Sequence, residues 1–163
     1  MLSKLKGKRV SRSGLTTYRL MMPEDVNIGG NVFGGAIVKY MDMIAAAVAF
    51  RHARKNVVTA SIDRMNFWAP VYVGNLLVLK ASVNYVGRTS MEVGVRIEME
   101  DVLTGRTAVT GSCYLTYVAL DKRGRPTPIP SIIPVTEEEK RRYRQAMTRR
   151  KLREEERAIL QRA

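Results

Sequence analysis

Cysteine and histidine each occur once in this sequence of 163 residues, as Cys113 and His52. A single cysteine excludes an internal disulfide framework and any metal site built from several thiolates, and it is typical of a reducing compartment. A single histidine argues equally against histidine-based metal sites and His-dependent catalytic triads. We therefore expect no metal and no cofactor. We interpret Cys113 as a core residue and His52 as a residue at a helix end.

Long apolar runs are also missing from the sequence. No stretch of eighteen apolar residues occurs, and residues 1–14 carry cations without the apolar segment that follows the charges in a secretory signal. This pattern predicts a cytoplasmic protein that does not insert into a membrane. Hydrophobic residues make up 45% of the chain, so its length is enough to bury the core of a single domain.

The net charge of +13 is concentrated at the two ends of the chain. Residues 1–19 hold six Lys or Arg and no acid, and residues 134–163 hold ten against six acids. Aromatic residues are not interleaved with these cations and no nucleic-acid-binding motif is present, so solvated tails are favoured over a nucleic-acid interface. A basic nucleic-acid-binding protein remains an alternative, and its binding to generic RNA would collapse with salt.

A glycine-rich loop precedes the most apolar segment of the chain. Four glycines lie between residues 29 and 35, around Asn31, and the fifteen residues from Ala36 to Phe50 contain no glycine or proline. This pattern predicts a loop that leads into a helix buried on most faces. Only Lys39 and Asp42 are charged within that helix. Asp42 is therefore either the i, i+3 partner of Lys39 or a residue with a chemical role.

The remaining segments read as strands and one polar helix. Alternating or β-rich patterns predict strands over residues 16–22, 57–67, 75–86, 91–99 and 107–120, and the short connections between the later strands predict antiparallel pairing. We expect Asn56 to cap the first helix, Asp63 and Arg64 to be ordinary strand polars, and residues 126–134 to cross the surface as extended chain. Thr136 and Glu139 form a capping-box pattern that begins a charged, peripheral C-terminal helix.

One long central helix wrapped by an antiparallel sheet of five or six strands, with the helix inserted after the first strand, is the hotdog arrangement of the α+β class. The sequence also resembles the cytosolic acyl-CoA thioesterases of the hotdog superfamily over residues 16–145. Six motifs carry the resemblance in order: Asn31-Val32-Phe33-Gly34-Gly35 with Met41-Asp42, Val57-Val58-Thr59-Ala60-Ser61, Asn66-Phe67, Val86-Gly87-Arg88-Thr89-Ser90, and Tyr117-Val118-Ala119-Leu120. We divide the chain into a basic tail (1–15), a hotdog thioesterase domain (16–134) and a charged helix or tail (135–163).

The resemblance implies hydrolysis of acyl-CoA to free fatty acid and CoA in a cleft between two subunits. Asp42 would be the general base or nucleophile, Asn31 would orient the water or the carbonyl, and the Gly35 N–H would hold the oxyanion. Gly34 would bind the substrate with Gly35, because unpaired N–H groups at a helix start favour an anion. Asp42 lies about two helical turns beyond Gly34 and Gly35. The carboxylate and the glycine N–H groups can therefore reach the same substrate carbonyl only if they come from different subunits of a dimer. The resemblance further implies a trimer of dimers.

Several of these candidate site residues could instead have a purely structural role. Asn31 is also typical of a turn, and residues 87–90 are either a plain hairpin turn or a place where Arg88, Thr89 and Ser90 meet a CoA phosphate. The resemblance favours CoA. A hotdog dehydratase would need a histidine and an acid in its site, which this chain does not offer, whereas a non-catalytic acyl-CoA-binding protein remains an alternative. Residues 57–61 are short, β-branched and free of proline, so we expect them to form the edge strand that pairs across the dimer.

Overall fold

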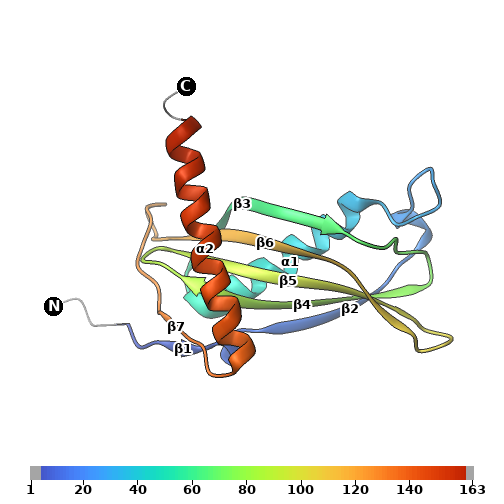
Figure 1. The fold of residues 1–163 in the computed structure, drawn as a ribbon, viewed down its shortest axis with the longest axis horizontal. Coiled ribbons are helices and arrows are strands. Elements are labelled where there is room, and N and C mark those ends of the chain that lie inside the picture. The colour runs from blue at the N-terminus through green and yellow to red at the C-terminus, as the bar shows by residue number, and fades with distance from the viewer. Residues whose placement is uncertain (1–4, 161–163) are drawn as a thin grey trace.

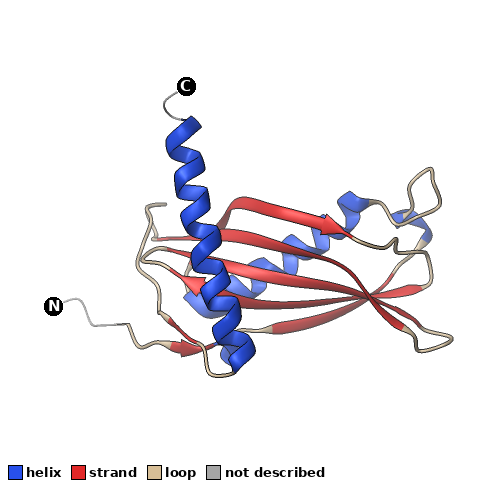
Figure 2. Cartoon of the chain, viewed as in Figure 1, coloured by secondary structure: helices blue, strands red, loops and turns tan. Residues whose placement is uncertain are grey.

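The computed structural model describes residues 5–160, which form one five-stranded sheet with a helix on each face (Figures 1 and 2). The sheet has the order β2-β4-β5-β6-β3, and all its pairs are antiparallel. The predicted long helix and antiparallel sheet are therefore confirmed. The elements in chain order are β1 (Lys8–Arg9), η1 (Val10–Arg12), β2 (Leu15–Leu20), η2 (Pro23–Asp25), α1 (Gly34–Ala53), β3 (Asn56–Phe67), β4 (Asn75–Val86), β5 (Ser90–Asp101), β6 (Thr107–Leu120), β7 (Ile132–Ile133) and α2 (Glu137–Leu160).

Strand alternation explains why the sheet has two different faces. The odd-numbered apolar residues of β5, from Met91 to Ile97, are buried in the core that includes α1. The even-numbered residues of β5 point to the other face, where Glu92 meets α2. Eight of the twenty residues of α1 are buried against the core side of the sheet, whereas Met43 and Phe50 are exposed. The prediction that this helix is buried on most faces is therefore wrong for the single chain. The charged helix α2 crosses the outer face (Figure 2).

Strand boundaries agree closely with the sequence patterns, but the end of α1 does not. The C-cap is Arg54, in a left-handed conformation with φ of 53°, and its N–H donates to the carbonyl of Phe50 at 2.8 Å. The predicted cap role of Asn56 is wrong, because β3 already begins at that residue. The C-cap of α1 is thus two residues earlier in the chain than the asparagine, Asn56, that we expected in this position.

The segment before β2 and the proline-spaced segment pack against each other. Strand β1 pairs in parallel with β7, and Val10 and Ser13 are buried. The prediction that residues 126–134 only cross the surface is wrong, because Ile129 and Ile132 enter the core cluster. Apolar side chains three residues apart in this extended segment point inward and tie it to the domain.

Ion pairs join helix α2 to the outer face of the sheet. The guanidinium of Arg149 donates to both carboxylate oxygens of Glu92, at 2.7 and 3.1 Å, and Arg153 bridges Glu92 and Asp63, at 3.3 and 2.9 Å. Asp63 is therefore an ion-pair partner of α2 rather than the ordinary strand polar that we predicted. Glu92 is almost fully buried, and loss of its arginine partners would leave an uncompensated charge. Ala146 is the α2 residue that is fully buried in this contact.

His52 lies at the end of α1, as predicted, and its ring is buried. Its Nε2 lies 2.8 Å from the carbonyl of Pro130, so the neutral ring donates there and fixes the proline-spaced segment. Lys8 donates to the carbonyl of His52 at 2.6 Å. Burial and the nearby Lys8 ammonium lower the pKa of His52, although the bond to Pro130 opposes them.

Acidification is expected to destabilise the fold partly through His52. The unfolded chain binds a proton below the ordinary pKa of 6.5, whereas the folded chain resists it. The stability contribution is therefore complete above pH 6.5 and is lost as the pH falls towards the lowered folded pKa, by up to about 1.4 kcal/mol per pH unit. Thermal melts from pH 7.5 down should show a smaller pH-dependent loss for His52→Gln than for the wild type. Parallel curves for the two proteins would contradict this role.

Candidate active site

The carboxylate of Asp42 is held by two hydroxyl groups from the sheet. Tyr117 of β6 donates to Oδ1 at 2.8 Å, and Thr59 of β3 donates to the same oxygen at 2.9 Å. Thr59 and Tyr117 are register partners in neighbouring strands, so both side chains reach the same face of the sheet. Within residues 5–160 no donor reaches Oδ2, and no ion pair joins Asp42 to Lys39, whose ammonium lies 5.9 Å from the Tyr40 ring centroid. The Lys39 interpretation of Asp42 is therefore wrong.

The sequence patterns did not indicate a role for Tyr117 or Thr59, although both residues lie in motifs that carry the resemblance. Their proximity to Asp42 depends on the pairing of β3 with β6, two strands that are separated by β4 and β5 along the chain. Sequence patterns give the strands but not this order. A hydroxyl-bearing residue on the core face of each strand was the available signal.

The start of α1 presents unpaired backbone donors. The helix begins at Gly34 directly after Phe33, and no side chain caps it. Among the described residues, the N–H groups of Gly34 and Gly35 have no hydrogen-bond acceptor, so they lie free at the positive end of the helix dipole. The Phe33 ring lies against Gly35, where a Cβ would collide with it. Glycine therefore allows this close approach.

Asn31 lies beside these donors. A hollow of about 350 Å³ is lined by Asn31, Gly34 and a mainly apolar set that includes Ile37, Phe67 and Val71. The turn is closed by Asn27, whose side-chain oxygen accepts the N–H groups of Gly29 and Asn31 at 2.8 and 3.3 Å. Gly30, not Asn31, adopts the left-handed conformation, with φ of 82°. Asn31 therefore lies in the turn, as one interpretation predicted, but without the left-handed conformation.

The two groups of residues do not meet within one chain. Eight residues of α1 separate Gly34 from Asp42, which corresponds to about 12 Å along the helix axis. Asp42 meets Thr59 near the start of β3, whereas Gly34 lies beside Phe67 at the end of the same strand. The glycine loop and the carboxylate therefore occupy different places along the β3 edge of the sheet.

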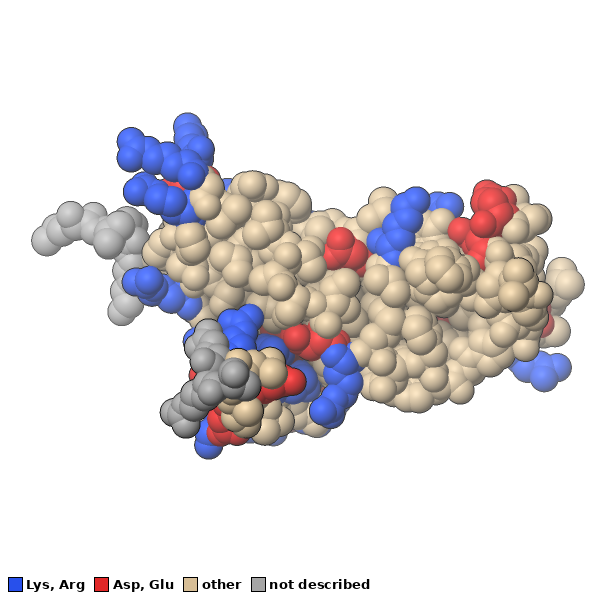
Figure 3. Space-filling model, turned by 90° about the horizontal axis from the view of Figure 1, so that it is seen from above, with Lys and Arg blue, Asp and Glu red and all other residues tan. Residues whose placement is uncertain are grey.

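Residues 87–90 form the turn between β4 and β5, closed by the Gly87 N–H donating to the Ser90 carbonyl at 2.8 Å. Ser90 pairs with Val118, directly beside Tyr117, so the turn lies at the Asp42 end of the sheet. Arg88 is exposed, and no side-chain partner is found for it in the described part of the chain. Many Lys and Arg side chains gather at this end of the molecule (Figure 3).

Cys113 is excluded as a nucleophile by its surroundings. Its side chain is fully buried on β6, and burial, with the Asp63 carboxylate as a smaller cause, raises its pKa to about 11. The thiolate that a nucleophilic cysteine needs is therefore not formed near neutral pH. The core role predicted for Cys113 agrees with this burial.

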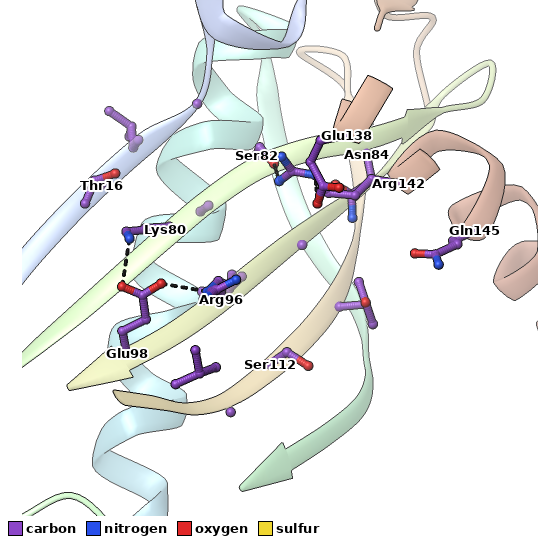
Figure 4. Close-up of a pocket in the computed structure, with 18 of the residues that line it drawn as sticks. Thr16, Lys80, Ser82, Asn84, Arg96, Glu98, Ser112, Glu138, Arg142 and Gln145 are labelled. Carbon is purple, nitrogen blue, oxygen red and sulfur yellow. Dashed lines mark hydrogen bonds and ion pairs between the residues drawn. The ribbon is translucent and has the colours of Figure 1, made fainter. Parts of the chain in front are cut away.

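A larger groove of about 830 Å³ lies on the outer face of the sheet beside α2 (Figure 4). None of the predicted site residues lines it. Its acids are already paired: Glu98 with Lys80 at 2.7 Å and Arg96 at 2.6 Å, and Glu138 with Arg141 at 2.6 Å. The groove therefore offers no free carboxylate, in contrast to Asp42.

A long helix packed on one face of a five-stranded antiparallel sheet is the hotdog arrangement. Residues 29–106 match the family model of the Thioesterase superfamily. The chain belongs to the acyl-CoA thioester hydrolase family within that superfamily, and the predicted resemblance is confirmed. Among residues 5–160, no helix has the length and apolar character needed to cross a membrane.

Two curated relatives and two solved structures illustrate the relationship. Protein VdlD of Helicobacter pylori is 41% identical over 142 residues, which cover 87% of this chain and 81% of that protein. The uncharacterized acyl-CoA thioester hydrolase YkhA of Bacillus subtilis is 40% identical over 119 residues, covering 73% and 69%. An apo-hexameric acyl-CoA thioesterase superposes with a TM-score of 0.92 at 43% identity, covering 95% and 99%. The acyl-CoA hydrolase of Staphylococcus aureus, in complex with butyryl-CoA, CoA and CoA disulfide, gives 0.89 at 37%, covering 95% and 94%.

Proposed function

We propose that this protein hydrolyses acyl-CoA thioesters to a free carboxylic acid and CoA, with Asp42 as the base that activates water. One observation carries the proposal. The Asp42 carboxylate is held through Oδ1 alone, by Tyr117 and Thr59, while Oδ2 has no donor among the described residues. An ionised oxygen without a protein donor can accept a proton from water. The family membership and the CoA complexes of the S. aureus hydrolase support the same substrate class.

The chemistry then needs donors for the oxyanion. Water adds to the thioester carbonyl as its proton passes to Asp42, and the carbonyl oxygen becomes an anion. The free N–H of Gly35, with Gly34 beside it at the dipole end of α1, is the donor we assign to that oxygen. Asn31 orients the carbonyl or the water through its amide. Collapse of the intermediate breaks the carbon–sulfur bond and releases CoA as the thiolate.

The CoA end of the substrate is assigned to the turn between β4 and β5. Arg88 is exposed there, with the hydroxyl-bearing Thr89 and Ser90 following it. A guanidinium beside hydroxyls and backbone amides suits a phosphate group. The concentration of cations at this end of the molecule adds a favourable long-range field for a polyanionic substrate (Figure 3).

We also propose that the smallest active unit is a dimer, and that dimers assemble as a trimer of dimers in a cytoplasmic enzyme. Gly34 and Asp42 are about 12 Å apart along one helix, which supports a site in which a second subunit supplies one of the two groups. Strand β3 is an edge of the sheet, and Val58 and Ile62 of β3, like Met43 and Phe50 of α1, are exposed in the single chain. A two-fold pairing of this edge would bury those apolar side chains. The similar thioesterase that is hexameric supports the higher assembly.

The test of this function is turnover against acyl-CoAs of increasing chain length, with the released thiol detected by a disulfide reagent. We expect a preferred chain length and kcat/KM on the order of 10⁴ M⁻¹s⁻¹ or above. Binding of acyl-CoA without thiol release at any chain length would favour the non-catalytic alternative. Salt-sensitive binding of generic RNA in the absence of turnover would favour a nucleic-acid-binding protein instead.

Arg88→Ala is expected to raise KM for acyl-CoA about tenfold, the loss that corresponds to one charge-assisted phosphate contact. The variant should hydrolyse a short thioester without the nucleotide at the wild-type rate, because only the CoA end has lost a partner. Steady-state kinetics on both substrates measure the difference. The matched control is Arg106→Ala, which removes an exposed arginine from the turn between β5 and β6. Equal losses on both substrates would contradict the phosphate role.

A further inference from the structure

Tyr117 brings a polar group into the core directly below Asp42. Its side chain is 1% exposed and is the largest fully buried side chain of the described chain. The hydroxyl donates to Asp42 Oδ1 at 2.8 Å and lies 3.1 Å from the Asp42 carbonyl oxygen. A buried hydroxyl without a partner is costly, so this contact fixes both the ring and the carboxylate.

The second donor makes the arrangement asymmetric. Thr59 reaches the same oxygen from the adjacent edge strand at 2.9 Å, and its residue is exposed whereas Tyr117 is buried. Oδ1 of Asp42 therefore accepts one hydrogen bond from the buried Tyr117 and one from the exposed Thr59. A carboxylate held this way cannot exchange its two oxygens without breaking two charge-assisted hydrogen bonds, each of which is stronger than a neutral one.

We infer that Tyr117 is a positioning residue for the proposed hydrolysis: its hydroxyl, with that of Thr59, holds Oδ1 of Asp42 so that Oδ2 is the oxygen that takes the proton from water. This inference rests on the proposed function. In this arrangement the two carboxylate oxygens of Asp42 have different tasks. Tyr117, a core residue of β6 that lies outside the glycine loop and outside the turn between β4 and β5, sets the orientation of the base.

The hydroxyl of Tyr117 suits this task because it stays protonated. Burial, followed by the hydrogen bond to Asp42, raises the pKa of Tyr117 well above its ordinary range. The hydroxyl is therefore protonated near neutral pH and can donate to Asp42. Its place is fixed by register, since Tyr117 pairs with Met91 on one side and with Thr59 on the other.

Tyr117→Phe removes the donor and keeps the ring. We expect kcat to fall roughly 10- to 100-fold, as for a lost hydrogen bond to a charged group, with KM for acyl-CoA changed less than about twofold. Thr59→Val removes the other donor and should act in the same direction, and Thr59→Ser should restore activity. The control is Tyr18→Phe on β2, whose ring is 63% exposed, and it should keep wild-type kinetics.

A double-mutant cycle with Asp42→Asn separates positioning from a structural contribution. Because Tyr117 acts through Asp42, adding Tyr117→Phe to Asp42→Asn should cause no further fall in kcat. The inference would be overturned if the losses multiply in the double variant, if Tyr117→Phe is unfolded, or if folded Tyr117→Phe keeps the wild-type kcat. In each of these cases the proposed function would still stand, provided that the wild-type protein hydrolyses acyl-CoA. An inactive wild-type protein would overturn both.

Discussion

Asp42→Asn is expected to reduce acyl-CoA hydrolysis by about 10² to 10⁴-fold while the protein remains folded, because a positioned base contributes a factor of that size. Asparagine keeps an oxygen that can accept from Tyr117 and Thr59, so the packing of α1 on the sheet is preserved. The amide cannot accept the proton of water as a carboxylate does. Measurement of kcat with a thiol reagent, alongside a thermal melt, tests both parts of the expectation.

The matched control is Lys39→Ala on the same helix. Lys39 is the nearest charge to Asp42 in sequence, is exposed and makes no ion pair with it in the part of the chain that the structure describes. Its replacement should leave kcat unchanged. Near-wild-type turnover of Asp42→Asn would remove Asp42 from the chemistry. A large effect of Lys39→Ala would restore the ion pair as the explanation for a charge at position 42.

The sequence was sufficient for those parts of the fold that depend on local patterns. The alternation in residues 91–99 predicted a strand with one buried face, and β5 has that face. The apolar run after the glycines predicted a helix, and α1 begins at Gly34 as expected, although only one side of it is buried in the single chain. The capping box of Thr136 and Glu139 is present, with each residue's side chain bonded to the other's backbone N–H. Short-range chemistry determines all three features.

The parts that escaped prediction depend on contacts between distant segments. The Arg153 bridge from Asp63 to Glu92 joins residues 90 and 61 positions apart, and nothing in the local pattern of Asp63 indicates it. The Tyr117 bond to Asp42 spans 75 positions and needs both the strand order and the register. The pairing of β1 with β7 likewise joins short segments near opposite ends of the domain. The periodicity of apolar residues indicates which face of a strand or helix is buried. It does not indicate these contacts, which depend on the order and register of the strands in the assembled sheet.

The candidate site follows the same division. Asp42, Asn31 and the paired glycines were selected because an acid in an apolar helix and glycines at a helix start are unusual locally. The structure adds that the glycine donors are uncapped and that the acid has one free oxygen within residues 5–160. It also keeps the two groups apart in one chain. Their separation makes the subunit arrangement the most informative property of the site.

Mixing two inactive variants is expected to restore activity. We propose that each site takes Asp42 from one subunit and Asn31 from its partner, so a dimer of Asp42→Ala with Asn31→Ala contains one site with both defects and one with neither. If subunits pair at random after dissociation, half of the dimers are mixed, and roughly a quarter of wild-type activity should return. Each variant alone should show only its residual rate.

The control for this experiment is a mixture of Asp42→Ala with Asp42→Asn, in which every site lacks the carboxylate and no activity should return. Native mass spectrometry of subunits with different masses shows whether exchange has occurred. Restored activity with the first pair only would mean that the helix start of one subunit serves the carboxylate of another. If exchange is complete and neither mixture regains activity, both residues act from the same subunit, and α1 must then be bridged by the substrate across about 12 Å.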